Sequence, residues 1–160
     1  SLASLGEPIA LYSRTKSLVD KREISITTLG ESEGRLPDGS TQITKFPSTS
    51  TPGKSNYLPL ENVVINEVLT HTDPPFEDAI ELRNISANMV NIGNWWISNS
   101  ETNLKKFQIS PSTTLSARGM AVFYEGQFNP APGAAHSFAL NSAHGDKIIL
   151  SKADGSGKLT

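Results

Sequence analysis

The chain has 160 residues, of which 36% are hydrophobic and 19% charged, so it can bury one substantial core or two small ones. Its formal net charge of −2 offers no broad cationic surface for nucleic acid phosphates or anionic lipid. It contains no Cys, which excludes disulfides and thiolate metal sites.

Apolar residues recur at every second position in short segments, which is the pattern of β-strands that bury one face. The first two strands are expected around Ile9–Leu11 and Ile24–Ile26. No segment carries a helical stripe through three turns. In the next strand, one face is expected to carry Val63, Ile65 and Glu67, and the other Val64, Asn66 and Val68. Further strands are expected around 80–82, 95–97, 107–109, 120–124 and 148–150.

Turn signals separate these strands at short intervals. Residues 36–40 place Pro and then Gly where a tight turn needs them, and residues 153–155 resemble the tip of a hairpin. Strands this short and this frequently interrupted are typical of a sandwich or barrel. The stretch from Pro47 to Pro59 is rich in Thr, Ser, Pro and Gly and is expected to be a linker.

Two distant segments resemble each other. Residues 5–11 and residues 144–150 both carry Gly, an acid, and then an apolar-x-apolar strand. A tandem array explains this pattern, with the chain beginning in the last strands of one module and stopping before the last strands of the next. The alternative is coincidence, because the pattern is common in hairpins.

A family resemblance is carried by five segments in order: 64–68, 77–84, 90–98, 115–123 and 145–150. Together, residues 62–160 resemble the lamin tail domain as it occurs in bacterial exported proteins. Asn94 stands where the family usually has Gly, and Asn tolerates a left-handed backbone better than most residues.

The N-terminal part resembles the same family read from its other end. Residues 34–39 and 51–56 are similar to the closing strands and exit of a preceding copy. On this interpretation the repeat is genuine. Residues 1–57 hold the end of one copy plus the linker, and residues 62–160 hold a second copy that lacks its last strands. The open edge would be filled by residues 1–46 of the same chain or of another copy.

The resemblance implies an all-β, immunoglobulin-like β-sandwich of short, mostly antiparallel strands. It also implies a non-enzymatic structural or adhesive binding module of a large exported bacterial multidomain protein, secreted or at the cell surface. Its expected partners are other domains of that protein or other copies of itself, with no nucleic acid and no membrane insertion. The alternatives are a carbohydrate-binding module and a subunit that self-assembles by strand complementation.

The aromatic residues supply the candidate binding groups. Trp95 shares a strand face with Ile97, and both are expected to anchor the core. Trp96 then points to the opposite face, where an indole can stack on sugar or peptide. Tyr124 and Phe128 are the other candidates for such a platform.

Acidic side chains cluster within fifteen positions and are candidates for calcium, although the spacing lacks the Asp-x-Asp-x-Asp-Gly loop. A solvated acidic rim is the simpler interpretation, and no cofactor is expected. Nothing in the pattern suggests a desolvated pocket for glycoside hydrolysis. The acids are Glu67, Asp73, Glu77, Asp78 and Glu81.

The remaining polar motifs are not specific. His71, His136 and His144 lack zinc-site spacing and are expected at the surface. No Gly-x-Ser-x-Gly elbow accompanies the Ser residues near His144 and Asp146. Residues 155–158 superficially resemble a phosphate loop but fit a hairpin tip better.

Overall fold

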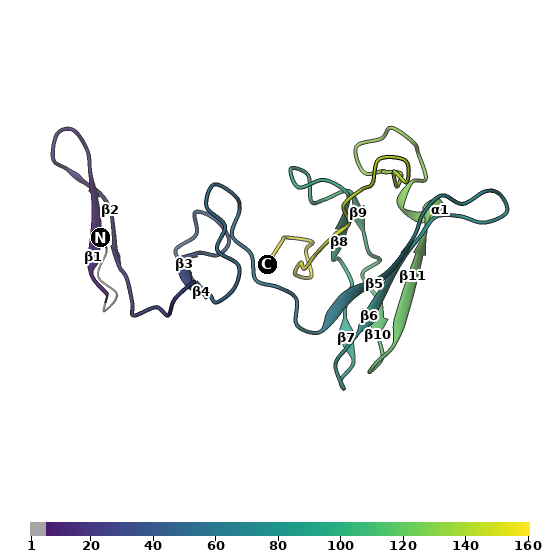
Figure 1. Cartoon of the computed structure of the whole chain (residues 1–160), viewed down its shortest axis with the longest axis horizontal. Coiled ribbons are helices and arrows are strands. Elements are labelled where there is room, and N and C mark those ends of the chain that lie inside the picture. Colours follow the sequence, from purple (N-terminus) through teal and green to yellow (C-terminus); the bar gives the residue numbers. More distant parts are fainter. Residues whose placement is uncertain (1–5) are drawn as a thin grey trace. The chain divides into compact units, whose positions relative to one another are not determined.

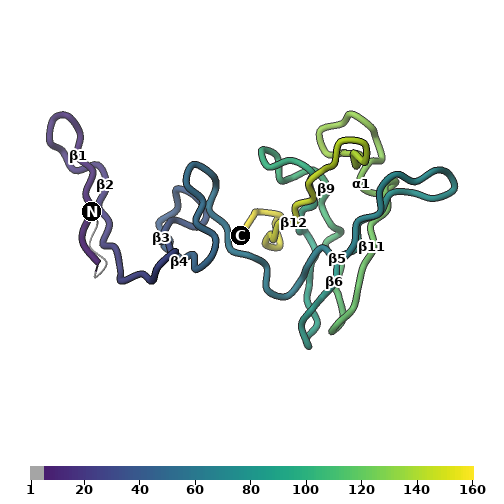
Figure 2. The backbone as a smooth tube through the Cα atoms, in the orientation of Figure 1, coloured from purple at the N-terminus to yellow at the C-terminus, as the bar shows by residue number. Residues whose placement is uncertain are grey.

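The computed structural model describes residues 6–160, which fall into two compact units divided between Pro59 and Leu60. Both units are built from short strands, and the strands pair antiparallel throughout the described residues (Figures 1 and 2). The all-β class predicted from the sequence is therefore confirmed. Within this part of the chain no helix is long and apolar enough to cross a lipid bilayer.

The first unit contains two separate hairpins. The first joins β1 (Pro8–Tyr12) to β2 (Leu18–Glu23), and the second joins β3 (Ser32–Arg35) to β4 (Ile43–Phe46). The turn predicted at residues 36–40 connects the second pair, where the Ser40 amide donates to the Pro37 carbonyl at 3.0 Å.

The prediction of a strand around Ile24 and Ile26 is wrong, because β2 ends at Glu23, just before Ile24. The Ile24 amide closes the ladder by donating to the Glu7 carbonyl at 3.0 Å, and Ile26 is 61% exposed. The true strand escaped detection because residues 20–23 are all charged. Apolar and polar residues alternate in a strand because one of its faces is buried, so a strand that is exposed on both faces lacks this alternation.

The segment from Pro47 to Pro59 folds back on the second hairpin. The Thr49 hydroxyl donates to the Tyr57 carbonyl at 2.8 Å, and the Asn56 side-chain amide donates to the Arg35 carbonyl at 3.0 Å. These bonds give order to a stretch whose composition alone favours an extended, solvated chain.

The second unit is a sandwich of two small sheets. One sheet has the order β11–β6–β5, the other the order β12–β8–β9, and β10 and β7 form a separate pair. A single helical turn, α1 (Glu125–Phe128), follows β11. The strands are β5 (Val63–Leu69), β6 (Ala79–Asn84), β7 (Val90–Asn91), β8 (Trp96–Ser98), β9 (Phe107–Gln108), β10 (Thr114–Leu115), β11 (Met120–Tyr124) and β12 (Ile149–Ser151).

Hydrocarbon from both sheets and their connections fills the space between them. Trp95 and Ile97, the residues expected to anchor the core, both lie in it. Phe128 and Phe138 stack with ring centroids 4.9 Å apart. The buried cluster comprises Val63, Ile80, Leu82, Ile92, Trp95, Ile97, Ile109, Leu115, Phe123, Phe128 and Phe138.

A β-bulge in β5 changes the predicted facing of its residues. Ile65 pairs with Leu82 and Glu67 pairs with Glu81, so Asn66 is the extra residue on its strand. An extra residue reverses the alternation beyond it. Glu67 therefore does not share the face of Ile65 as predicted. It is Val68 that joins Ile65 beside the sandwich interior, where both line one groove.

Asn94 adopts the left-handed conformation that its place in the sequence requires. Its φ is +66°, and its amide donates to the Ile109 carbonyl at 3.0 Å. The preceding Gly93 has no room for a side chain, since a Cβ there would lie 2.0 Å from the Pro111 carbonyl oxygen. The tight turn before β8 thus survives with Asn at the position that the family usually gives to Gly.

Asn84 is a fully buried polar side chain at the end of β6. Its amide nitrogen donates to the carbonyls of Asn88 at 2.7 Å and Ser116 at 2.8 Å. Its amide oxygen accepts from the backbone and the hydroxyl of Ser86 at 2.9 and 2.8 Å. One side chain therefore satisfies groups from two loops at the same end of the sandwich.

Replacing Asn84 by Leu is expected to lower the free energy of unfolding by about 2–4 kcal/mol, because buried carbonyls and an amide lose their partner. Urea denaturation of the Asn84→Leu variant measures this. Asn62→Leu is the control, since Asn62 is exposed and should tolerate the change. Equal stability of the two variants would show that the Asn84 network contributes nothing net.

Candidate functional site

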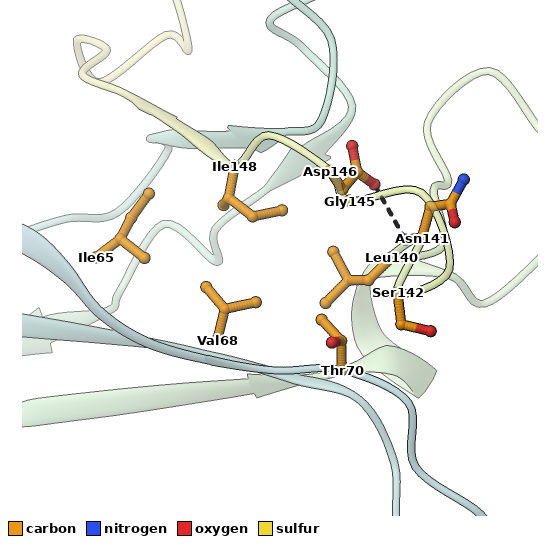
Figure 3. A pocket seen from close by; sticks show the side chains of 9 residues that line it. All are labelled: Ile65, Val68, Thr70, Leu140, Asn141, Ser142, Gly145, Asp146 and Ile148. Atoms are coloured by element: carbon orange, nitrogen blue, oxygen red, sulfur yellow. Dashed lines mark hydrogen bonds between the residues drawn. The ribbon is translucent and has the colours of Figure 1, made fainter.

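An open groove of about 440 Å³ lies in the second unit between β5 and residues 140–148 (Figure 3). Its floor is apolar. Ile65 and Val68 approach from β5, while Leu140 and Ile148 approach from the opposite side. The polar lining residues are Thr70, Asn141, Ser142 and Asp146. Apolar side chains below and polar groups at the margin suit an amphipathic occupant.

Asp146 organises the loop that forms one wall of this groove. Its carboxylate accepts from the Asn141 amide at 3.2 Å, as Figure 3 shows, and from the Asn99 side-chain amide at 3.1 Å. Gly145 makes the turn possible with φ of +73°. Asp146 therefore holds the wall in place, and its carboxylate is already engaged in hydrogen bonds.

The strands nearest the groove are both sheet edges. Among the described residues β5 pairs only with β6, and β12 pairs only with β8. An edge strand presents backbone N–H and C=O groups that can hydrogen-bond to an added strand. An extended peptide can therefore pair with such an edge while its alternate side chains enter the apolar floor.

A second, smaller hollow of about 200 Å³ lies on the other face of the β11–β6–β5 sheet, which we call the outer face. Tyr124, one of the predicted platform residues, lines it and is 51% exposed. Leu69 and Val122 flank it, and Glu67 and Glu81 face each other across the neighbouring strands. The outer face thus joins apolar groups to two adjacent carboxylates.

Trp96 points away from the core as predicted, but its ring is only partly accessible. The indole nitrogen donates to the Gly157 carbonyl at 2.9 Å. The Lys105 ammonium lies 5.6 Å from the ring centroid, within reach of a cation–π interaction. Because these groups already occupy the ring's polar edge and one face, Trp96 is chiefly a tie between β8 and the turn at residues 153–159.

Phe128 cannot act as the exposed platform that the sequence suggested. Its side chain is fully buried and stacked on Phe138. The short helix α1 turns it inward, into the cluster that separates the two sheets. The prediction was wrong because a lone aromatic after a strand carries no signal of which way the following turn directs it.

Two of the acidic residues considered for calcium, Asp78 and Glu77, make hydrogen bonds in separate parts of the fold. Asp78 is 8% exposed and accepts from the Thr72 amide and hydroxyl at 3.2 and 2.8 Å. Glu77 accepts from the Gly126 amide at 2.8 Å. Over residues 6–160, no three His, Asp or Glu side chains gather in a way that could hold a metal ion. His71 and His136 bond to different loop groups, Ser142 and Lys105.

The model of the Lamin Tail Domain family matches residues 59–158. The chain belongs to the lamin tail domain family. No curated protein and no solved structure matches it. The matched range spans nearly the whole second unit, so the sandwich of β5 to β12 is the lamin tail domain, with the immunoglobulin-like fold expected from the sequence. Membership indicates a non-catalytic module.

Sequence reasoning missed the groove of this lamin tail domain. Leu140 and Asn141 were not singled out, because the segment from 129 to 147 has no clear periodicity. The bulge at Asn66 concealed the contribution of Val68. The only available signal was the alternation Phe138-Ala139-Leu140, which places two apolar groups on one side of an extended stretch.

The turn that caps Trp96 is held by Asp154. One carboxylate oxygen accepts from the Ser156 hydroxyl at 2.6 Å, the Ser156 amide at 2.8 Å and the Lys158 amide at 3.1 Å. The hydrogen bonds from Ser156 contribute most, and the one from the Lys158 amide contributes less, to holding the pKa of Asp154 below its usual range. Ala153 bridges to Leu159 across this turn, which confirms the predicted hairpin tip.

Loosening this turn is expected to expose Trp96. Asp154→Ala should shift tryptophan emission to longer wavelength, with buried Trp95 as a constant background, whereas Asp73→Ala, at another exposed loop carboxylate, should not. Because the folded turn lowers the pKa of Asp154, the ionised carboxylate stabilises the turn fully at pH values above the ordinary carboxyl pKa of about 3.9. This stabilisation is lost as the pH falls through the pKa of the folded state. Acid should therefore produce the same shift in the native chain. An unchanged Asp154→Ala spectrum would contradict this role.

Proposed function

We propose that this chain is a structural or adhesive binding module of a large exported bacterial multidomain protein, present there in tandem copies. It binds other domains of its parent protein or other copies of itself, and it works without a cofactor, nucleic acid or membrane insertion. Its location is outside the cell, secreted or at the cell surface.

The observation that carries this proposal is the apolar groove in the lamin tail domain, beside two strands that are sheet edges within residues 6–160. Such a surface recognises a polypeptide through backbone hydrogen bonds and alternate side chains. Asp146, the carboxylate that lines the groove, already accepts hydrogen bonds from the Asn141 and Asn99 amides and serves to hold the groove wall.

The buried polar groups support a structural role as well. Asn84 and Asp78 bond to their own loops, and the buried Ser98 hydroxyl donates to the Asn103 carbonyl at 2.6 Å. Buried polar side chains that bond to nearby loop groups fix loop positions.

Tandem copies are supported by the likeness of residues 5–11 to residues 144–150, which falls on β1 in one unit and on the approach to β12 in the other. The Leu5 end of the first match lies outside the described residues. The exported location is supported by the resemblance to bacterial lamin tail domains and by the absence of Cys in a chain rich in Ser, Thr and Asn.

A non-catalytic module is expected to unfold and refold reversibly without cofactor and to show no hydrolytic turnover. Thermal melting followed by re-cooling, with and without a chelator, tests the first point. Assays on generic ester, peptide and glycoside substrates test the second. A turnover that one point substitution abolishes while stability is unchanged would overturn the proposal.

A carbohydrate-binding role is the second candidate, favoured by exposed Tyr124 in its hollow on the outer face. It predicts glycan-array binding that falls at least tenfold in Tyr124→Ala, because stacking on an aromatic ring is lost. Trp96→Ala tests the other aromatic candidate. The control is Tyr57→Ala, since Tyr57 is 55% exposed and lies in the first unit. An array with no binding would dismiss this candidate.

A further inference from the structure

The β1–β2 hairpin leaves its apolar side chains in solvent. Ile9, Leu11, Leu18 and Val19 are between 40% and 61% exposed. A two-stranded hairpin alone is only marginally stable in water, because it has no third element on which to bury a face. The hairpin therefore gains stability from any surface that covers it.

The two edges of this hairpin differ in character. Residues 20–23 of β2 are all charged, and Asp20 and Lys21 are engaged by Arg35 at 3.0 Å and Glu23 at 2.8 Å. Charged edge strands resist pairing with another strand. In contrast, β1 has the sequence Pro-Ile-Ala-Leu-Tyr and carries no charged side chain. Among residues 6–160, the uncharged β1 edge is thus the better suited of the two to a further partner.

The second unit offers a matching surface. Strand β12 is the edge of its sheet among the described residues, and the groove beside it has Ile65, Val68 and Ile148 in its apolar floor. The segment that enters β12, residues 144–150, also resembles residues 5–11 at β1 in sequence, and β1 accepts an antiparallel neighbour along its length. A strand of this type can therefore hold a second partner at its free edge.

We propose that the β1–β2 hairpin of a second copy of this chain adds to the free edge of β12 and covers the apolar groove. This rests on the proposed binding role of the module and names its partner. The contact joins two different surfaces, so each copy can give a hairpin and accept one. Reciprocal dimers or open chains of copies follow from such a contact.

Sedimentation velocity of the full chain over a wide range of concentration tests the proposal, and self-association is expected. Val68→Lys puts a charge in the groove, and Leu11→Lys puts one on the hairpin. Each should reduce the association constant at least tenfold. Val122→Lys and Leu29→Lys are matched controls, because these residues are similarly or more exposed but lie on the outer face and on a loop outside the hairpin.

A mixture of the two variants distinguishes the proposed contact, which joins a hairpin to a groove, from a contact that joins identical surfaces. The Val68→Lys chain keeps an intact hairpin and the Leu11→Lys chain keeps an intact groove, so mixing them should restore dimers. A native chain that stays monomeric, controls that lose association equally, or a mixture that stays monomeric would each overturn the proposal. None of these results would affect the non-catalytic role, which fails only if turnover is found.

Discussion

The lamin tail domain of this chain depends on the apolar contact between two sheets of three strands each. Each sheet has one apolar face, and each needs the other to bury that face away from water. Trp95 and Ile97 lie at this contact, close to Leu82 and Ile80 in the same buried cluster. That shared interior positions the strands that carry the groove and the outer face.

Irregularities in the strands give this plain sandwich its particular surfaces. The extra residue Asn66 directs Val68 toward the groove and Glu67 to the outer face. At the end of β6, Asn84 joins two loops by hydrogen bonds that no apolar residue could replace. The surfaces of the module therefore arise from a few local departures from regular pairing, on a scaffold whose interior is filled with hydrocarbon.

Much of the fold could be predicted because the second unit has half-buried strands. Alternation located β11 at its observed bounds, and the core role of Trp95 followed from its spacing to Ile97. Alternation failed where its physical cause is missing. The exposed β2 has no buried face, the bulge at Asn66 breaks the period, and the groove wall at residues 140–148 is held by side-chain bonds to Asp146.

The paired carboxylates of Glu67 and Glu81 have a consequence for how copies of this module can meet. Like charges directly opposite each other on a sheet repel, and two outer faces brought together would double that repulsion. Apolar neighbours such as Leu69 and Val122 would otherwise make this face adhesive to itself. The carboxylate pair thus discourages face-to-face stacking of copies through this outer face.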